Sequence, residues 1–453
     1  IMTRVRLSRR QFIQGLGALS ILPIVACADG VEQTPSAISV TAPGGYLMPD
    51  EGEPHSATWM AYGATAAAWG TSGNYGASRA IARKDLMRIA ANLSRFEPVK
   101  MLVSNEKDKQ EALDFLTQIR AEPVSAAVGQ YEENAVYTGG KALPPIEAAG
   151  AIELLIQPVN DLWTRDTAPV FVHAVGQPAD KNLYAVNFNF NGWGQEDTGA
   201  SGWRKDPEKA ENGIGDQRVT EDQRVADFII GQTGATKIST WLVMEGGGIE
   251  VDGQGTALCT ESCILNPNRN PNKSKADVEA ELARILGIKK VIWLPGVRAK
   301  EITDGHIDFY ARFVGPAQVV YTLDNDPDSS DYHATQEHKR ILSAATDAQG
   351  RPIRAIALDT PNFEDVEKTV VARNWSSGKS KFNADGFAAG YVGFYLANQC
   401  VLMARFGDAA ADLRAFEQIQ ALYPDRHVMQ ITTDGLANGG GTIHCATQQQ
   451  IRV

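Results

Sequence analysis

The sequence predicts an α/β fold, and three observations lead to this prediction. Short apolar segments typical of buried strands alternate along the chain with longer segments that have the apolar period of helices. Hydrophobic residues make up 43% of the chain and charged residues 21%, as in an ordinary globular protein. No stretch in the middle of the chain has the composition of a linker. We therefore expect one large α/β domain behind an N-terminal leader.

The leader, residues 1–27, has the features of an export signal. Ser8-Arg-Arg-Gln-Phe-Ile13 resembles a twin-arginine signal, and the apolar stretch 15–26 is too short to span a bilayer as a stable helix. Ile24-Val-Ala-Cys27 resembles a bacterial lipobox, in which the thiol of Cys27 would carry a lipid. The alternative is ordinary signal-peptidase cleavage near Cys27. We expect export by the twin-arginine route, to the periplasm or to a lipid anchor on the membrane.

The folded domain is expected to span residues 46–453, after a small, polar and flexible tether at 28–45. Helical periodicity first occurs at 79–96, where Ile81, Leu86 and Ile89 share one face. Further helices are expected at 219–233, 275–286, 332–348 and 409–422. Apolar runs predict strands at 57–62, 99–103, 152–156, 183–188, 256–258, 290–294, 318–322 and 401–404.

Charge and cysteine content exclude several classes of protein. The formal net charge of −11 argues against a nucleic-acid partner and suits a cationic ligand. Five cysteines are too few for a disulfide scaffold in a chain of this length. Cys259 and Cys263 form a C-x3-C pair, but no Cys/His pair with zinc spacing accompanies them. No metal site is therefore expected.

Four stretches combine acidic residues, His or Cys with turns. Asp166 follows Trp163-Thr-Arg in an expected loop, and Glu245 leads a Gly-rich turn. His306 and Asp308 are two residues apart, which places them on one face if the segment is extended. Cys445 follows Gly439-Gly-Gly441, and backbone N–H groups of such a turn can stabilise a thiolate; the alternative is a Gly-rich loop with a buried, inert cysteine.

This set of residues indicates covalent catalysis at a carbonyl-like or amidine-like carbon. A cysteine protease needs only one group to orient its histidine, whereas Asp166, Glu245 and Asp308 are all candidates here. The excess of negative charge suits a planar guanidinium, which carboxylates bind through paired hydrogen bonds. Each residue alone has an ordinary structural explanation, and it is their joint occurrence that favours catalysis.

Together the four stretches and Asn266-Pro-Asn-Arg-Asn-Pro271 resemble the agmatine deiminase family, which also contains bacterial peptidylarginine deiminases. The resemblance runs from about Tyr46 to the end of the sequence. It implies a pentein fold, an α/β architecture of five ββαβ-type units around a pseudo-fivefold axis with the site in the central channel. It also implies metal- and cofactor-free hydrolysis of agmatine to N-carbamoylputrescine and ammonia.

The same resemblance implies a role for each matching residue. Cys445 would be the nucleophile, His306 the general acid/base, and Glu245 the group that orients His306. Asp166 and Asp308 would hold the guanidinium nitrogens. The other candidate substrate-binding residues, which lie in the same motifs, are Trp163, Arg165 and Gly440.

Two alternatives remain open. In Glu51-Gly-Glu-Pro-His55, Gly52 stands where the family usually has Trp, so the pocket for the substrate tail differs and a peptidyl-arginine or another arginine derivative is a second possible substrate. The other alternative is a surface lipoprotein that binds cationic ligands without turnover. The joint presence of the five candidate catalytic and clamp residues argues against it.

Overall fold

The computed structural model describes residues 44–69, 73–121, 135–178, 182–197, 203–204, 209, 218–374 and 386–453. The predicted signal with Cys27, and most of the predicted tether, lie outside the described residues. All features below belong to the structural unit Ser39–Val453. Among the described residues, none of the helices combines the length and apolar character that crossing a membrane requires.

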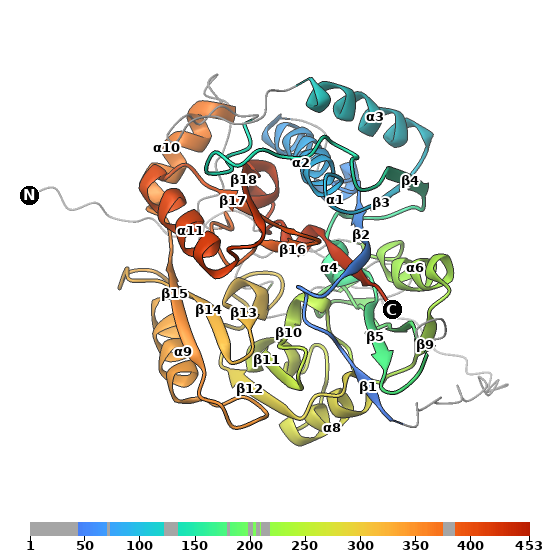
Figure 1. Ribbon diagram of the computed structural model, residues 1–453, viewed down its shortest axis with the longest axis vertical. Helices are drawn as coiled ribbons and strands as arrows, with labels where there is room; N and C mark the ends of the chain where they lie inside the picture. Colours follow the sequence, from blue (N-terminus) through green and yellow to red (C-terminus); the bar gives the residue numbers. More distant parts are fainter. Residues whose placement is uncertain are drawn as a thin grey trace, which may run out of the picture. The chain divides into compact units, whose positions relative to one another are not determined.

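In the described part of the chain, five sheets share one pairing rule: a strand pairs antiparallel with the next, which pairs parallel with a third. The sheets are β5 (Val170–Ala174), β6 (Tyr184–Val186) and β9 (Thr236–Ile238); β10 (Ile249–Val251), β11 (Thr256–Thr260) and β12 (Lys290–Leu294); β13 (Ala311–Gly315), β14 (Gln318–Leu323) and β15 (Arg354–Asp359); β16 (Tyr395–Ala397), β17 (Cys400–Arg405) and β18 (His427–Thr432); β19 (Gln448–Ile451), β2 (His55–Ala61) and β3 (Val99–Val103). Figure 1 shows them following one another around a common centre.

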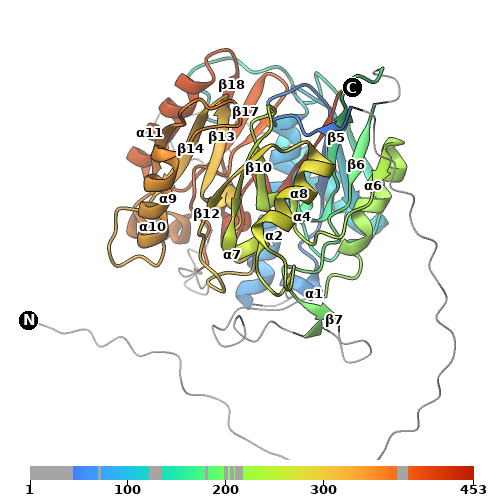
Figure 2. The same cartoon turned by 90° about the horizontal axis from the view of Figure 1, so that it is seen from below.

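A helix connects the two parallel strands of each unit, because a parallel pair needs a long crossover. The crossover helices are α2 (Gly73–Leu93), α6 (Val225–Thr233), α8 (Lys275–Leu286), α9 (Tyr332–Ala344) and α11 (Ala409–Leu422). Seen from below, α8 and α9 lie in front of the strands of their sheets, so the strands lie between these helices and the centre (Figure 2). The middle strands β11 and β17 are buried along their whole length.

Additional elements extend this repeat. β1 (Tyr46–Leu47) adds to the edge of β5, and β4 (Ile152–Ile156) adds to the edge of β3. The remaining described elements are α1 (Ala66–Trp69), α3 (Glu106–Arg120), α4 (Thr164–Thr167), β7 (Glu196–Asp197), β8 (Trp203–Arg204), η3 (Asp222–Arg224), η4 (Gly246–Gly248), α7 (Glu261–Ile264), η5 (Ile307–Phe309), α10 (Phe363–Asn374), α12 (Asp434–Asn438) and η6 (His444–Ala446).

One sheet joins the two ends of the unit. β19 pairs antiparallel with β2, so that Gln448 lies opposite Trp59. The Trp59 indole donates to the Gln450 side chain over 3.0 Å. The last strand of the sequence, β19, is therefore held in a sheet by β2, one of the first strands. Cys445 lies three residues before β19.

Most predicted elements are confirmed. The strands at 99–103, 152–156 and 290–294 and the helices at 275–286 and 409–422 have the predicted bounds. Two expectations were wrong: residues 307–309 form a 3-10 turn rather than an extended segment, and Asp166 lies in the short helix α4 rather than in a loop. The five-unit α/β architecture implied by the resemblance is confirmed by the repeated pairing rule.

Candidate active site

The candidate residues occupy equivalent places in different units. α4, η4, η5 and η6 are short helical turns that each precede the first strand of a unit, namely β5, β10, β13 and β19. α4 contacts both η4 and η6, and η4 contacts η5. The fivefold repeat therefore brings together segments that are far apart in the sequence. These turns carry or adjoin Asp166, Glu245, His306, Asp308 and Cys445.

His306 and Glu245 form a buried pair. The Nε2 atom of His306 lies 3.0 Å from Oε2 of Glu245. Burial disfavours a charged imidazole, but Asp166, Cys263 and Glu245 outweigh it and hold the pKa of His306 well above its usual value. The imidazole is thus an acid that can donate a proton from its other nitrogen, Nδ1, which faces the carboxylates described next.

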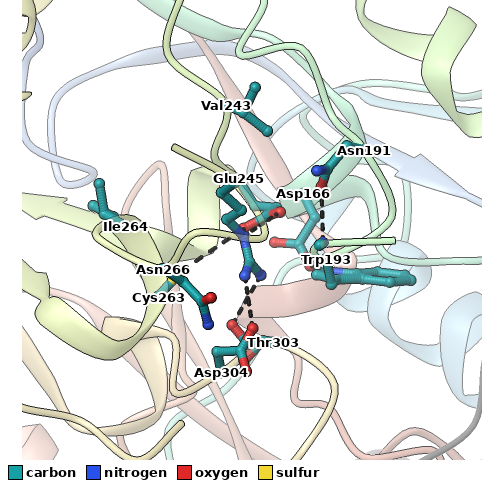
Figure 3. A network of polar contacts seen from close by, with 12 residues as sticks. Asp166, Asn191, Trp193, Val243, Glu245, Cys263, Ile264, Asn266, Thr303 and Asp304 are labelled. Atoms are coloured by element: carbon teal, nitrogen blue, oxygen red, sulfur yellow. Dashed lines mark hydrogen bonds and ion pairs between the residues drawn. The ribbon is translucent and has the colours of Figure 1, made fainter. Parts of the chain in front are cut away.

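Arg269 fixes Glu245 from the opposite side. Its Nε lies 3.0 Å from both carboxylate oxygens, and its other nitrogens donate to Asp304 over 2.8 Å and to the carbonyl of Thr303 over 2.9 Å. Figure 3 shows Glu245, Thr303 and Asp304 converging in this network. Burial alone would raise the pKa of Glu245, but Arg269 and His306 lower it to about 2. Glu245 therefore stays ionised and holds His306 in place.

Asp166 and Asp308 each present one oxygen without a partner. Oδ1 of Asp166 and Oδ1 of Asp308 are buried and have no hydrogen-bond partner, although they lie 3.7 and 4.0 Å from Nδ1 of His306. The other Asp166 oxygen accepts from the indole of Trp193 over 2.9 Å (Figure 3). Two unpaired carboxylate oxygens facing one point form a site for a group with several N–H donors and a positive charge.

The two carboxyl groups differ in their surroundings. Burial raises the pKa of Asp166 to about 6, with His306 opposing the rise and Glu245 and Asp308 adding to it. Burial acts in the same direction on Asp308, but the hydrogen bond and charge of His444 outweigh it and hold the pKa below its ordinary value. Asp308 is the permanent anion of the pair.

Cys445 lies in η6 beside this anion. Its Sγ is 3.7 Å from Oδ2 of Asp308 and 3.4 Å from the hydroxyl of Thr442. Burial and the charges of Asp308 and Asp166 raise the pKa of the thiol well above its usual value. The N–H groups of Gly439-Gly-Gly441 bond to carbonyls of α12 instead of the thiol.

Gly247 leaves room for a ligand at the centre. A Cβ atom on this residue would lie 2.6 Å from Nδ1 of His306, 2.9 Å from Oδ1 of Asp166 and 3.1 Å from Oδ2 of Asp308. The three groups therefore surround a space that even a methyl group would fill, next to the nucleophile candidate.

The other predicted site residues have the following surroundings. The Arg165 guanidinium donates hydrogen bonds to Glu51, Gln449 and the carbonyl of His444. Trp163 stacks on Trp69 at a ring distance of 6.4 Å. Gly440 has a φ of 92°, which favours glycine. Their substrate contacts stay predictions.

Sequence reasoning gave no role to Arg269, Trp193, Cys263 and His444, which touch the central groups, or to Glu51, which contacts His444. The Sγ atom of Cys263 lies 3.8 Å from Oε2 of Glu245. Cys263, Glu245 and His306 place possible metal-ligand atoms within 4.8 Å of one another. Arg269 already occupies both Glu245 oxygens, so this donor set does not fit a metal ion.

Comparisons with known proteins agree with this geometry. The family model for the Porphyromonas-type peptidyl-arginine deiminase matches residues 47–450. The agmatine deiminase of Medicago truncatula is 30% identical over 415 residues, which cover 90% of this chain and 96% of that protein. The agmatine deiminase of Pseudomonas fluorescens (strain SBW25) is 30% identical over 409 residues, 90% of this chain and 95% of that protein. A solved structure of the Enterococcus faecalis agmatine deiminase matches with a TM-score of 0.70 and 28% identity, covering 92% and 99% of the two chains.

Proposed function

The chain belongs to the Porphyromonas-type peptidyl-arginine deiminase family, and from this premise we infer that it is a hydrolase of guanidino groups that acts on agmatine. The reaction adds water to the guanidinium carbon of agmatine and yields N-carbamoylputrescine and ammonium. Relatives that carry the name agmatine deiminase, at 30% identity over 90% of the chain, support this substrate.

The observation that carries the proposal is the pair of unpartnered, buried oxygens on Asp166 and Asp308. A guanidinium offers several N–H donors in one plane together with a positive charge, and both carboxylates gain hydrogen bonds when it lies between them. The same position is next to Nδ1 of His306 and to Sγ of Cys445, so the carbon to be attacked is next to its nucleophile.

In the first half of the reaction, substrate charge activates the thiol. The guanidinium offsets the two anions that raise the pKa of Cys445, which favours the thiolate once the substrate is bound. The thiolate attacks the guanidinium carbon and forms a C–S bond. His306 donates a proton to one nitrogen, the C–N bond breaks, and ammonia leaves behind a cationic thiouronium-like adduct.

In the second half, His306 changes from acid to base. Having lost its proton to ammonia, it accepts one from a water molecule that attacks the adduct carbon. The C–S bond breaks, the ureido product leaves, and Cys445 and His306 return to their starting states. Glu245 keeps the imidazole oriented through both proton transfers, and Arg269 keeps Glu245 ionised.

The decisive experiment is ammonia release by the purified protein with agmatine, with free arginine, and with peptides that carry an internal or C-terminal arginine. We expect release from agmatine, and none from the Cys445→Ala variant. Agmatine bound without ammonia release by the wild-type protein would favour the binder over the enzyme. Substantial turnover by Cys445→Ser would contradict the covalent step.

A peptidyl-arginine is the second candidate substrate, because the matching family model describes a peptidyl-arginine deiminase and because Gly52 replaces the usual Trp. The chemistry would be the same and the product a citrulline residue. Faster ammonia release from either peptide than from agmatine would establish this substrate.

We also propose that residues 1–27 direct export by the twin-arginine route and that Cys27 becomes the lipidated N-terminus of a periplasmic lipoprotein. The basis is the sequence alone, Ser8-Arg-Arg-Gln-Phe-Ile13 followed by Ile24-Val-Ala-Cys27. A mature protein that begins at Cys27 and carries the mass of a lipid is the expected result of mass spectrometry on the exported chain. A water-soluble protein of unmodified mass would contradict lipidation.

A further inference from the structure

A second buried histidine, His444, lies beside the site with a contact at each ring nitrogen. Nδ1 is 2.8 Å from Oδ2 of Asp308, and Nε2 is 2.9 Å from Oε2 of Glu51. His444, Asp308 and Glu51 are exposed by 1%, 1% and 6%. Ionised carboxylates only accept hydrogen bonds, so this arrangement uses an N–H group at both nitrogens of the ring.

Glu51 is held as firmly as Glu245 is on the other side of the site. Its two oxygens accept from Arg165 over 2.8 Å, from Arg312 over 2.9 Å and from the backbone N–H of Leu396 over 2.8 Å. These cations, together with His444, outweigh burial and hold the pKa of Glu51 well below its usual value. The chain of contacts from arginine to glutamate to histidine thus occurs twice around the centre.

The two series of side-chain contacts end at histidines with different surroundings. Arg269–Glu245 ends on His306, whose free nitrogen faces the reacting groups. The second series of contacts runs from Arg165 and Arg312 through Glu51 to His444. The ring nitrogen of His444 that does not contact Glu51 contacts Asp308 instead. Asp166, the other clamp carboxylate, receives its hydrogen bond from the neutral indole of Trp193.

We propose that His444, oriented by Glu51, is a positioning residue that keeps Asp308 ionised and turns its unpartnered oxygen toward the guanidinium. This inference rests on the proposed function, because it assigns a task within the same site. It explains how one carboxylate of a buried, mutually repelling pair remains an anion. The Asp308 carboxylate is then already ionised before the substrate binds, so substrate binding does not have to remove its proton.

The charged and titratable groups near Asp308 come from its own segment, from α4 and from η6. They are His306 on its own segment, Asp166 and Arg165 from α4, and His444 and Cys445 from η6. Burial and Asp166 oppose ionisation of Asp308, whereas His444 acts on it through both a hydrogen bond and its charge. Loss of His444 should therefore raise the pKa of Asp308, because the hydrogen bond and charge that oppose burial most strongly are removed.

The test measures alkylation of Cys445 by 2-chloroacetamidine, a cationic probe, and by 2-chloroacetamide, its neutral counterpart. In both reactions the thiolate displaces chloride, forming an S–C bond as the C–Cl bond breaks. Any change in thiol reactivity affects both rates, so their ratio reports the attraction of the anionic clamp for a cation. The ratio is measured from pH 6 to pH 9 for wild type, His444→Gln and Asp308→Asn.

We expect His444→Gln to lower the amidine-to-amide ratio at pH 7 by about tenfold for each unit by which the pKa of Asp308 comes to exceed the pH. The ratio should return toward the wild-type value as the pH rises. Asp308→Asn, which is neutral at every pH, should keep a low ratio throughout. His338→Gln is the matched control, because His338 is fully buried and accepts from the N–H of Gly296 outside the site. It should keep the wild-type ratio.

Two results would overturn the proposal. One is an amidine-to-amide ratio in His444→Gln that equals the wild-type ratio, and the other is a reduction of this ratio that is the same at every pH. Thermal melting shows whether the variant is folded, and His444→Asn replaces it if it is not. Because the probes do not involve agmatine, a wild-type protein that fails to release ammonia from agmatine would contradict the proposed function and still leave the ratio measurable. A wild-type ratio near one would overturn both the clamp and this inference.

Discussion

Gly247 is the residue at which side-chain size bears most directly on the site. A Cβ atom added to Gly247 would lie 2.6 Å from Nδ1 of His306 and 2.9 Å from Oδ1 of Asp166. Gly247→Ala should therefore fill the guanidinium position and push the acid/base and clamp groups apart. We expect kcat/KM for ammonia release from agmatine to fall by about 100-fold or more, since small misplacements of reacting groups have effects of this order.

The adjacent glycine is the control for this prediction. A Cβ on Gly248 would first meet Sγ of Cys263 at 3.5 Å, an ordinary van der Waals contact. Gly248→Ala, in the same 3-10 turn, should keep kcat/KM within a few fold of wild type. Equal losses in the two variants would mean that the turn responds to any side chain and that Gly247 has no special place.

Asp166 should control how substrate affinity depends on pH. Its pKa is raised to about 6, chiefly by burial, and only its ionised form attracts a guanidinium. Affinity is therefore present above pH 6 and is lost as the pH falls through that value. We expect KM for agmatine to rise below about pH 6, measured by initial rates of ammonia release from pH 5 to pH 8.

Trp193→Phe tests the assignment of this titration. The indole N–H donates to Asp166 and lowers its pKa, so its removal should move the break in KM to higher pH. A break that stays in place in this variant, or that persists unchanged in Asp166→Asn, would assign the titration to another group.

At the residue scale, the sequence predicts the groups that lie in its own motifs and misses the partners that fix them. Cys445, His306 and Glu245 stand out because of their neighbours along the chain. His444 and Glu51 are 393 residues apart in the sequence, and no local pattern announces their contact. Arg269 belongs to a recognisable motif, but its role depends on where Glu245 and Asp304 lie in space.

Among the elements, α3 begins at a well-defined cap. The side chain of Asn105 accepts from the backbone N–H of Asp108 over 3.0 Å, which satisfies one of the free donors of the first turn. Asn105→Ala should lower the free energy of unfolding by about 1 kcal/mol, measured by urea denaturation, and leave ammonia release unchanged. Asn105→Asp keeps an acceptor at this position and should keep the stability. A loss of activity in the folded Ala variant would contradict the separation of α3 from the site.

The elements that position the site are the ones the sequence predicts least well. β10, which follows the turn after Glu245, has only three residues, too few to show the alternation that identifies a longer strand. Turns such as η5 are set by contacts between units, so Asp304-Gly-His306 gives little local sign of a helical turn. The strands β3, β4 and β12 and the crossover helices α8 and α11 are regularly apolar, which is why their bounds were predictable.

For the molecule as a whole, β19 should be essential although it lies at the end of the sequence. Deleting residues 448–453 removes the antiparallel neighbour of β2, the Gln450 contact of Trp59 and the Gln449 contact of Arg165. We expect a lower melting temperature and a loss of about 100-fold or more in kcat/KM, because η6 with Cys445 loses its anchor.

Removing Val453 alone is the matched deletion, since this residue is exposed and lies beyond the strand. It should leave melting temperature and rate as in wild type. Full activity after loss of residues 448–453 would show that the position of Cys445 does not depend on the closing strand.

The pairing of β19 with β2 also orders events in time during folding. Trp59 and Gln450 are 391 residues apart, so their contact is among the last that a growing or refolding chain can make. The three earlier turns, α4, η4 and η5, can form within their own units, but Cys445 reaches its place only when β19 pairs with β2. In a refolding experiment, recovery of catalysis would then lag behind recovery of secondary structure. The rate at which enzyme activity returns would report the rate at which β19 pairs with β2.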